Sequence, residues 1–374
     1  MIGPIGLYAH FPWCVRKCPY CDFNSHPLRG ALDEASYLAA LQADARDALA
    51  QLAPGQIASV FFGGGTPSLF SPEAFAELLA RLRPWLASAA EVTMEANPGT
   101  VEHHDFAGYR RAGINRLSLG AQSFEPQQLR SLGRIHDAED TTRAFATARR
   151  AGFDNINLDL MYGLPQQTPG AALADLRAAL ELGPEHLSWY QLTIEAKTEF
   201  ARRPPMLASE SATATMEAQG HALLAEHGYR RYEVSGYARA GFECRHNVNY
   251  WTFGDYLGIG AGAHGKLTSG RGRTKHIVRT RKPSQPRLYM AAPLTTERVP
   301  VPHEELVFEF MMNALRLTDG VDWEVFEART GLDPGCLEPT WERLAAQGLV
   351  RRHRIATTDL GYRYLDGVLE RFLT

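Results

Sequence analysis

Three of the five cysteines in this 374-residue chain lie within eight positions near its N-terminus. They are Cys14, Cys18 and Cys21, which give the spacing C-x3-C-x2-C. Thiolates are soft ligands that suit iron–sulfur clusters and zinc. Three thiolates can hold a [4Fe–4S] cluster and leave one iron open to a small molecule. The spacing therefore predicts a metal centre with one open coordination position.

Structural zinc is the alternative occupant of these cysteines, but it requires four ligands, usually in two separated pairs. The other two cysteines, Cys244 and Cys336, are remote singletons that are best explained as small buried apolar side chains. His10 and His26 could complete a zinc site, although neither has a partner at the spacing of known zinc motifs. The sequence therefore favours the cluster.

Polar side chains follow several apolar runs further along the chain. In a barrel of parallel strands, polar groups at the carboxyl ends of the strands face the ligand. The glycine-rich segment is not a phosphate-binding loop, because no Lys-Ser/Thr pair follows it. The segments that carry these polar groups are Phe61–Pro67 (FFGGGTP), Thr93–Pro98 (TMEANP), Leu119–Ser123 (LGAQS), Arg134 and Asn157–Pro165 (NLDLMYGLP).

Short apolar runs alternate with amphipathic segments over the first half of the chain, which predicts successive βα units and a parallel sheet. The predicted strands are Ile5–Phe11, Ala58–Gly63, Glu91–Asn97, Arg116–Ser123, Asn155–Tyr162 and His186–Ile194. The predicted helices between them are Asp33–Leu52, Pro72–Leu86, Val101–Ala112, Ala138–Ala151 and Gly170–Leu182. The fold class is therefore α/β, with a full or partial barrel or an open sheet.

The second half of the chain has a different organisation. We expect a loop near residues 195–210, a helix over Thr213–His227, and a basic, proline-rich linker over residues 271–302. Three helices should follow, at His303–Leu317, Trp323–Thr330 and Cys336–Gln347, then a winged-helix-like hairpin and a last helix from Asp359. The expected domains are residues 1–270, the linker 271–302, and a mostly helical, winged-helix-like domain over 303–374.

The cysteine motif, together with these later segments, resembles the radical S-adenosylmethionine (SAM) superfamily. Within it, the chain resembles the HemN/HemW branch, which holds oxygen-independent coproporphyrinogen III oxidases and haem chaperones. The resemblance covers residues 5–265 and implies a partial (β/α)6-type barrel. It also implies that the open iron of a [4Fe–4S] cluster on the three cysteines binds SAM, and that the reduced cluster cleaves SAM to a 5′-deoxyadenosyl radical.

The resemblance also implies a role for each residue that matches a family motif. Tyr8 lies at the floor near the cluster and SAM, and Phe23 lies against the adenine. The turn Gly63, Gly64, Gly65 and Thr66 approaches the amino end of SAM. Glu95 and Asp159 accept hydrogen bonds from the ribose hydroxyls or the amino group, while Gln122 and Arg134 orient the ribose and the carboxylate.

Two departures from the oxidase pattern favour the haem-binding members of the branch. Phe23 stands where the oxidases have a fourth cysteine, and only 13 residues precede Cys14. The segment His246–Trp251 (HNVNYW) resembles the HNxxYW signature of this branch, in which the histidine can ligate haem iron. His264, in the glycine-rich turn that follows, is the second candidate ligand.

The resemblance thus implies a haem chaperone that carries a [4Fe–4S] cluster and SAM and passes haem to an acceptor protein. An oxygen-independent coproporphyrinogen III oxidase is the alternative, so enzymatic activity stays open, and a winged-helix nucleic-acid binder with a redox cluster is a weaker one. The net charge of −3, from 39 basic and 42 acidic residues, provides no field for nucleic acid. No apolar run is long enough to span a bilayer, and no signal segment begins the sequence, so we expect a cytoplasmic protein, with a homodimer left open.

Overall fold

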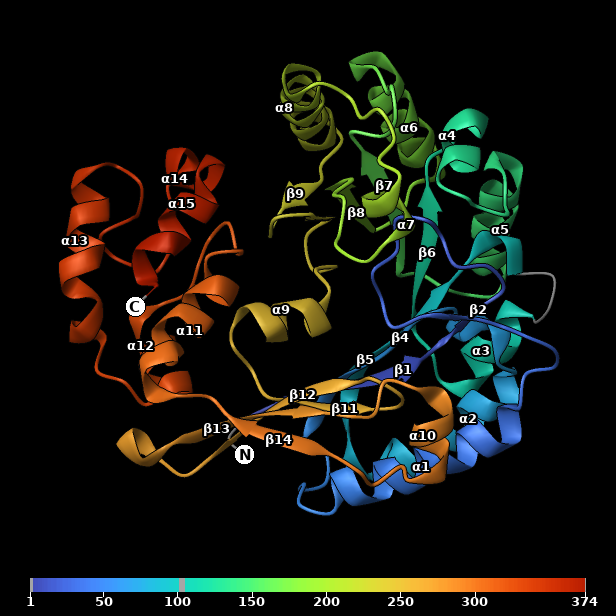
Figure 1. Cartoon of the computed structure of the whole chain (residues 1–374), viewed down its shortest axis with the longest axis horizontal. Helices are drawn as coiled ribbons and strands as arrows, with labels where there is room; N and C mark the ends of the chain where they lie inside the picture. The colour runs from blue at the N-terminus through green and yellow to red at the C-terminus, as the bar shows by residue number, and fades with distance from the viewer. Residues whose placement is uncertain (1–2, 101–104, 374) are drawn as a thin grey trace.

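The computed structural model describes residues 3–100 and 105–373. Its central feature is a single twelve-stranded sheet that curves into a partial barrel, with helices on its outer side (Figure 1). Six consecutive parallel strands form the middle of this sheet. They are β1 (Ile5–Phe11), β4 (Ile57–Gly64), β5 (Leu86–Ala96), β6 (Arg116–Gln122), β7 (Ile156–Tyr162) and β8 (His186–Gln191). The sequence-based prediction of successive parallel βα units is confirmed.

Further strands extend both ends of the sheet. On the side of β8 lie β10 (Gly236–Ala238) and β9 (Arg230–Arg231), both antiparallel to their neighbours. On the side of β1, the parallel strand β11 (Tyr256–Ile259) is followed by the antiparallel strands β12 (His264–Ser269), β13 (His276–Arg281) and β14 (Glu297–Pro300). The outermost strands, β14 and β9, do not pair with each other, so the barrel is open.

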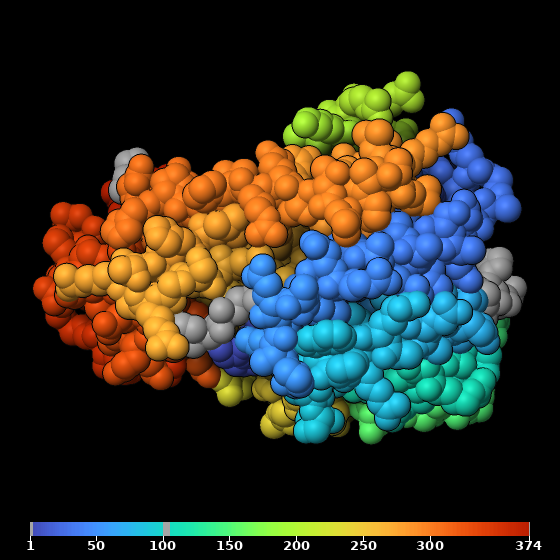
Figure 2. All heavy atoms as spheres, turned by 90° about the horizontal axis from the view of Figure 1, so that it is seen from below, coloured from blue at the N-terminus to red at the C-terminus, as the bar shows by residue number. Residues whose placement is uncertain are grey.

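The segment 271–302 differs from the expected linker. It contains β13, α10 (Pro286–Ala291) and β14, and it adds two strands to the sheet. Strands near the edge of a sheet tolerate proline and charged residues, because one of their sides is open. The prolines and arginines of this segment therefore obscured the alternation of polar and apolar residues by which a strand is predicted. On the surface, α10 lies beside α1 (Glu34–Leu49), as Figure 2 shows.

Six helices that cover the barrel correspond to predicted ones. They are α1, α2 (Pro72–Leu82), α3 (Phe106–Ala112), α5 (Ala138–Arg150), α6 (Pro169–Leu182) and α8 (Glu210–Glu226). The short helices α4 (Pro126–Ser131) and α7 (Glu199–Arg202) were not predicted. The helix α2 ends before the predicted Leu86 and passes into a 3-10 turn at Arg83–Trp85, because Pro84 has no N–H to continue the α-helical hydrogen bonds. Of the predicted helix Val101–Ala112, the first four residues lie outside the described residues. The short helix α7 interrupts the expected loop at 195–210.

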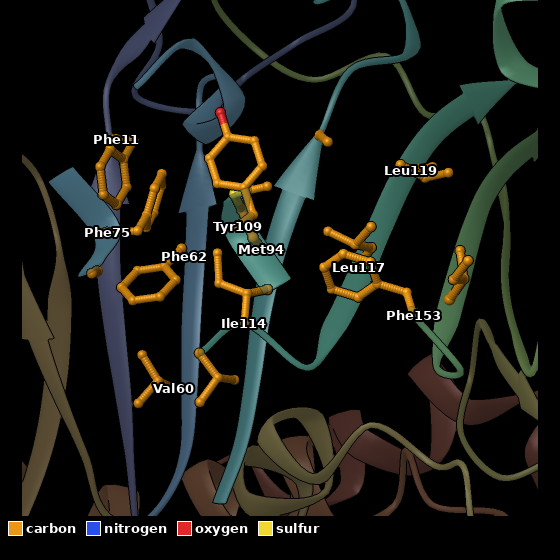
Figure 3. Packing of buried hydrophobic residues seen from close by; sticks show 14 of the residues in the cluster. Phe11, Val60, Phe62, Phe75, Met94, Tyr109, Ile114, Leu117, Leu119 and Phe153 are labelled. Atoms are coloured by element: carbon orange, nitrogen blue, oxygen red, sulfur yellow. The ribbon is translucent and has the colours of Figure 1, made fainter. Parts of the chain in front are cut away.

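Alternation along the strands divides each one into an outer and an inner face. The outer face packs against the helices through Phe62 of β4, Met94 of β5 and Leu117 of β6, together with Phe75 of α2 and Tyr109 of α3 (Figure 3). Since successive side chains of a strand point to opposite faces, the residues between these apolar positions face the inside of the barrel. The apolar core thus determines which polar residues point inward.

The C-terminal helices form a second hydrophobic cluster, separate from the barrel core, around Phe310, Phe326 and Trp341. The helices are α11 (Leu306–Ala314), α12 (Trp323–Thr330), α13 (Glu338–Ala346), α14 (Asp359–Arg363) and α15 (Leu365–Leu369). The expected wing consists of an antiparallel bridge between Val350 and Thr357. Helix α9 (Arg245–Trp251) lies between the barrel strands and α11 (Figure 1). None of the described helices has both the length and the apolar composition needed to cross a membrane.

Candidate functional site

The inside of the barrel is lined by one partly exposed side chain from each of several strands. Tyr8 on β1, Phe61 on β4, Glu95 on β5 and Asp159 on β7 each stand out from otherwise buried runs. Tyr8 and Phe61 are register partners, and their rings stack with centroids 6.3 Å apart. Two carboxyl groups and an aromatic floor therefore line the interior.

The cysteine loop leaves the carboxyl end of β1. Cys14, Cys18 and Cys21 are all half-buried and none forms a disulfide. Hydrogen-bond donors approach the sulfurs, because Nη1 of Arg134 lies 3.7 Å from Sγ of Cys18, and Oγ of Ser25 lies 3.6 Å from Sγ of Cys21. Such donors stabilise thiolates in iron–sulfur centres and tune their potential.

The three thiols fit a cluster better than a single ion. Within residues 3–100 and 105–373, no three His, Cys, Asp or Glu side chains lie close enough together to hold one metal ion. Burial raises the pKa of the Cys14 thiol, and hydrogen bonds with Thr66 and Ser25 oppose that rise. In a [4Fe–4S] cluster each thiolate binds a different iron atom. The three sulfurs must therefore lie near one another, but they need not come as close together as the ligands of a single ion.

His10, considered above as a zinc ligand, is engaged elsewhere. Its Nδ1 lies 2.8 Å from the Tyr8 hydroxyl, and its Nε2 lies 2.8 Å from the Asn24 carbonyl oxygen. The Asn24 amide in turn donates to the carbonyl oxygens of Ala261 and Ser284. This chain of hydrogen bonds connects the end of the cysteine loop to the barrel floor and to the turns after β11 and β13.

The glycine-rich turn after β4 packs directly against the start of the cysteine loop. Gly64 has φ 119°, and a Cβ there would lie 2.5 Å from the His10 ring. A Cβ at Gly65 would lie 2.5 Å from the Trp13 carbonyl oxygen, and the Thr66 N–H donates to that same oxygen at 2.7 Å. Only glycine therefore permits this approach of the two segments. The turn ends on the same barrel edge as the cysteines.

Glu95 and Asp159 have different surroundings. Glu95 accepts a hydrogen bond from the Gly64 N–H at 3.0 Å, and burial followed by the charge of Asp159 raises its pKa to about 8. Asp159 accepts hydrogen bonds from Ser118 at 3.0 Å and Asn157 at 2.8 Å, which oppose the rise that burial causes in its pKa. This pair suits a ligand with an ammonium or hydroxyl group.

Gln122 and Arg134 meet above the end of β6. Oε1 of Gln122 accepts a hydrogen bond from the Tyr190 hydroxyl at 2.8 Å, and Gln122 has φ 68°. Arg134 donates through Nη2 to the Gly120 carbonyl oxygen at 2.7 Å, while its Nε has no hydrogen-bond partner among the described residues. An arginine with a spare donor suits a carboxylate. Sequence reasoning missed Tyr190, although its place as a polar residue in the apolar strand β8 was a usable signal.

Phe23 is 60% exposed, which is unusual for a phenylalanine beside a buried loop. Its backbone is held by Lys17, whose ammonium donates to the Phe23 carbonyl oxygen at 3.0 Å. The ring is thus available to a ligand, as the expected contact with adenine requires.

The structure places His246 on helix α9, away from the cysteine loop. It is 1% exposed, and its Nδ1 lies 3.0 Å from Ser59 Oγ while its Nε2 lies 2.9 Å from the Tyr250 hydroxyl. Burial lowers its pKa to about 3. Both ring nitrogens are therefore occupied in this conformation, and the geometry gives His246 a role in anchoring α9 to β4.

Of the two remote cysteines, Cys244 is buried as expected and donates to Glu91 across 3.6 Å. Cys336 is exposed, so its description as a buried apolar residue is wrong. It precedes α13, in a turn that the sequence pattern assigned to the helix itself.

The chain is similar in sequence and in fold to known proteins. Residues 8–179 match the radical SAM superfamily, and residues 301–364 match the HemN C-terminal domain. The chain is 46% identical over 376 residues to the haem chaperone HemW of Escherichia coli, covering 100% of this chain and 99% of that protein. It is also 46% identical over 381 residues to HemW of Haemophilus influenzae, with 100% and 99% covered. The solved structure of the E. coli coproporphyrinogen III oxidase HemN, a radical SAM enzyme, aligns with TM-score 0.80 at 23% identity, covering 99% of this chain and 90% of that one.

Proposed function

This chain belongs to the radical SAM superfamily, in the branch of HemW, and on that basis we propose that it binds haem and transfers it to an acceptor protein. The observation that carries the proposal is the 46% identity to two haem chaperones over the full length of the chain. The likeness to HemN, at 23% identity, concerns the fold alone.

The barrel would hold two cofactors. Cys14, Cys18 and Cys21 would hold a [4Fe–4S] cluster, which supplies one-electron chemistry to SAM when both are bound. Arg134 would bind the SAM carboxylate, because it combines a spare donor with a place beside Cys18. Glu95 and Asp159 would bind the amino and ribose groups, Gln122 would orient the ribose, and Phe23 would cover the adenine.

The competing function is oxygen-independent coproporphyrinogen III oxidation. Phe23 in place of a fourth cysteine supports the chaperone. We also propose that the protein acts in the cytoplasm, and that the barrel with its extension and the C-terminal region from residue 303 are separate domains.

One experiment separates the two functions. After anaerobic reconstitution, we expect the protein to bind haem with a saturable Soret band and to form no protoporphyrinogen IX from coproporphyrinogen III with SAM and a reductant. A coproporphyrinogen III oxidase assayed in parallel is the positive control. Turnover at a rate comparable to that control would replace the chaperone with the oxidase.

His246 requires its own test, because ligation of haem iron would break one of its two hydrogen bonds. We expect His246→Ala to destabilise the protein by about 2 kcal/mol, because it leaves buried polar partners unpaired. Tyr250→Phe, which removes only the Nε2 partner, should cost about 1 kcal/mol. Thermal unfolding measures both, and the Soret maximum should stay in place. A displaced Soret band in His246→Ala with unchanged unfolding would instead make His246 the haem ligand.

A further inference from the structure

A cavity of about 480 Å³ lies at the amino ends of β1 and β4, at the opposite end of these strands from the cysteine loop. Its walls come from three parts of the chain, which are the first residues of those strands, helix α9 with the loop before it, and helix α12 of the C-terminal region. Pro4, Ile5 and Val248 contribute apolar surface. Ligand pockets typically enclose roughly 300–1,000 Å³ with mostly apolar walls and a few polar groups.

The charged residues of this cavity are Arg245, Arg329 and Glu243, so its lining carries one net positive charge. Among the described residues, neither Arg245 nor Arg329 has an ion-pair partner within 4.0 Å. Arg329 also lies near Lys275, whose pKa is lowered by partial burial and then by the charge of Arg329. Glu327 and Asp255 oppose this lowering, and Glu243 lies in the lining itself, so the positive charge of the wall is only partly balanced.

Arg245 is held in place by the strand below it. Its backbone N–H donates to Glu91 Oε2 at 3.2 Å, and the next residue, His246, donates to the other carboxylate oxygen at 3.2 Å. The guanidinium Nη1 of Arg245 donates to the Ala89 carbonyl oxygen at 2.7 Å. The remaining guanidinium donors are therefore presented from a fixed position rather than from a freely moving side chain.

We propose that this cavity is the haem site, in which Arg245 and Arg329 bind the propionate carboxylates and the apolar wall of α9 contacts the edge of the macrocycle. The inference rests on the proposed function and specifies where it takes place. A flat apolar ring with two carboxylates matches a largely apolar cavity that presents two guanidinium groups without ion-pair partners among the described residues, since arginine pairs well with carboxylates. Haem would then bind at a distance from the cluster and SAM.

The test compares ferric haem with haem dimethyl ester, which keeps the ring and lacks the carboxylate charges. We expect Arg245→Gln and Arg329→Gln each to weaken binding of haem about tenfold, the loss expected for one charge-assisted hydrogen bond. Binding of the dimethyl ester should change little. The matched control is Arg177→Gln, which changes an exposed arginine on α6. This helix contributes no residue to the cavity, so both affinities should be unchanged.

Three results would overturn the inference. If both variants and the unaltered protein bind haem with the same affinity, the cavity is not the haem site, and the proposed chaperone function is unaffected. Equal loss of haem and of its ester indicates a structural defect rather than lost carboxylate contacts. Loss of haem in His264→Ala but not in the arginine variants moves haem to the exposed His264 at the start of β12. If the unaltered protein binds no haem, the proposed function itself fails.

Discussion

Alanine at Cys14, Cys18 or Cys21 is expected to abolish the iron–sulfur cluster. Each change removes one of three thiolates, and two thiolates leave two irons without a protein ligand. After anaerobic reconstitution, the variants should lack the broad visible absorbance of the cluster and should contain close to no iron. Iron and sulfide analysis, together with the absorption spectrum, measures the effect.

The two remote cysteines provide matched controls within the same chain. Cys336→Ala changes an exposed thiol and should leave iron content and folding unaltered. Cys244→Ala removes a buried thiol that donates to Glu91, so it should lower thermal stability somewhat and still retain the full iron content. Retention of iron by the Cys18 variant, with loss of iron in the Cys244 variant, would contradict the assignment.

Glu95→Gln should produce the largest change in SAM binding among the carboxylate variants, because Glu95 has few internal partners to compensate its charge. Loss of a charge-assisted hydrogen bond should cost about 1.5–3 kcal/mol, or roughly 10–150-fold in Kd. Calorimetry on the cluster-loaded protein measures this loss. Glu181→Gln on the exposed surface of α6 is the control. An unchanged Kd in Glu95→Gln would remove Glu95 from the SAM site.

The pH dependence gives an independent check on Glu95. Its pKa is raised from 4.5 to about 8, so the carboxyl group is protonated near neutral pH before SAM binds. A bound ammonium favours the carboxylate, so SAM affinity should rise as pH increases toward about 8 and then level off. Glu95→Gln should flatten that rise over the same range.

The stability of the SAM-free protein should move in the opposite direction. A carboxyl group whose pKa is higher in the folded state binds its proton more tightly there, so its contribution is complete below about pH 4.5 and is lost as pH rises through about 8. Glu95→Gln should therefore stabilise the SAM-free protein more at pH 8 than at pH 6. Thermal unfolding at the two pH values tests this, and an equal change at both would contradict it.

The sequence alone predicted the six parallel strands and the set of motifs at their carboxyl ends. That success has a local cause. Buried parallel strands are continuous apolar runs, so a single polar residue such as Tyr8 or Glu95 stands out against its neighbours in the sequence. The end of a strand can also be predicted from the turn-forming residues that follow the apolar run, such as the three glycines of Gly63–Thr66. The three cysteines and the polar residues after successive strands could therefore be assigned to one barrel edge before any contact was known.

The tertiary structure decided what depends on residues far apart in the chain. Strands β13 and β14 have no strong pattern of their own, and their pairing with β12 makes them part of the sheet. His246 belongs to a conspicuous motif, yet it is buried because α9 packs against β4, where its ring forms a hydrogen bond with Ser59, 187 positions away. The cavity of Arg245 and Arg329 brings together α9 and α12, which no spacing in the sequence relates. Periodicity and turn chemistry act between neighbouring residues, whereas burial, pKa shifts and cavities arise only when distant segments pack together.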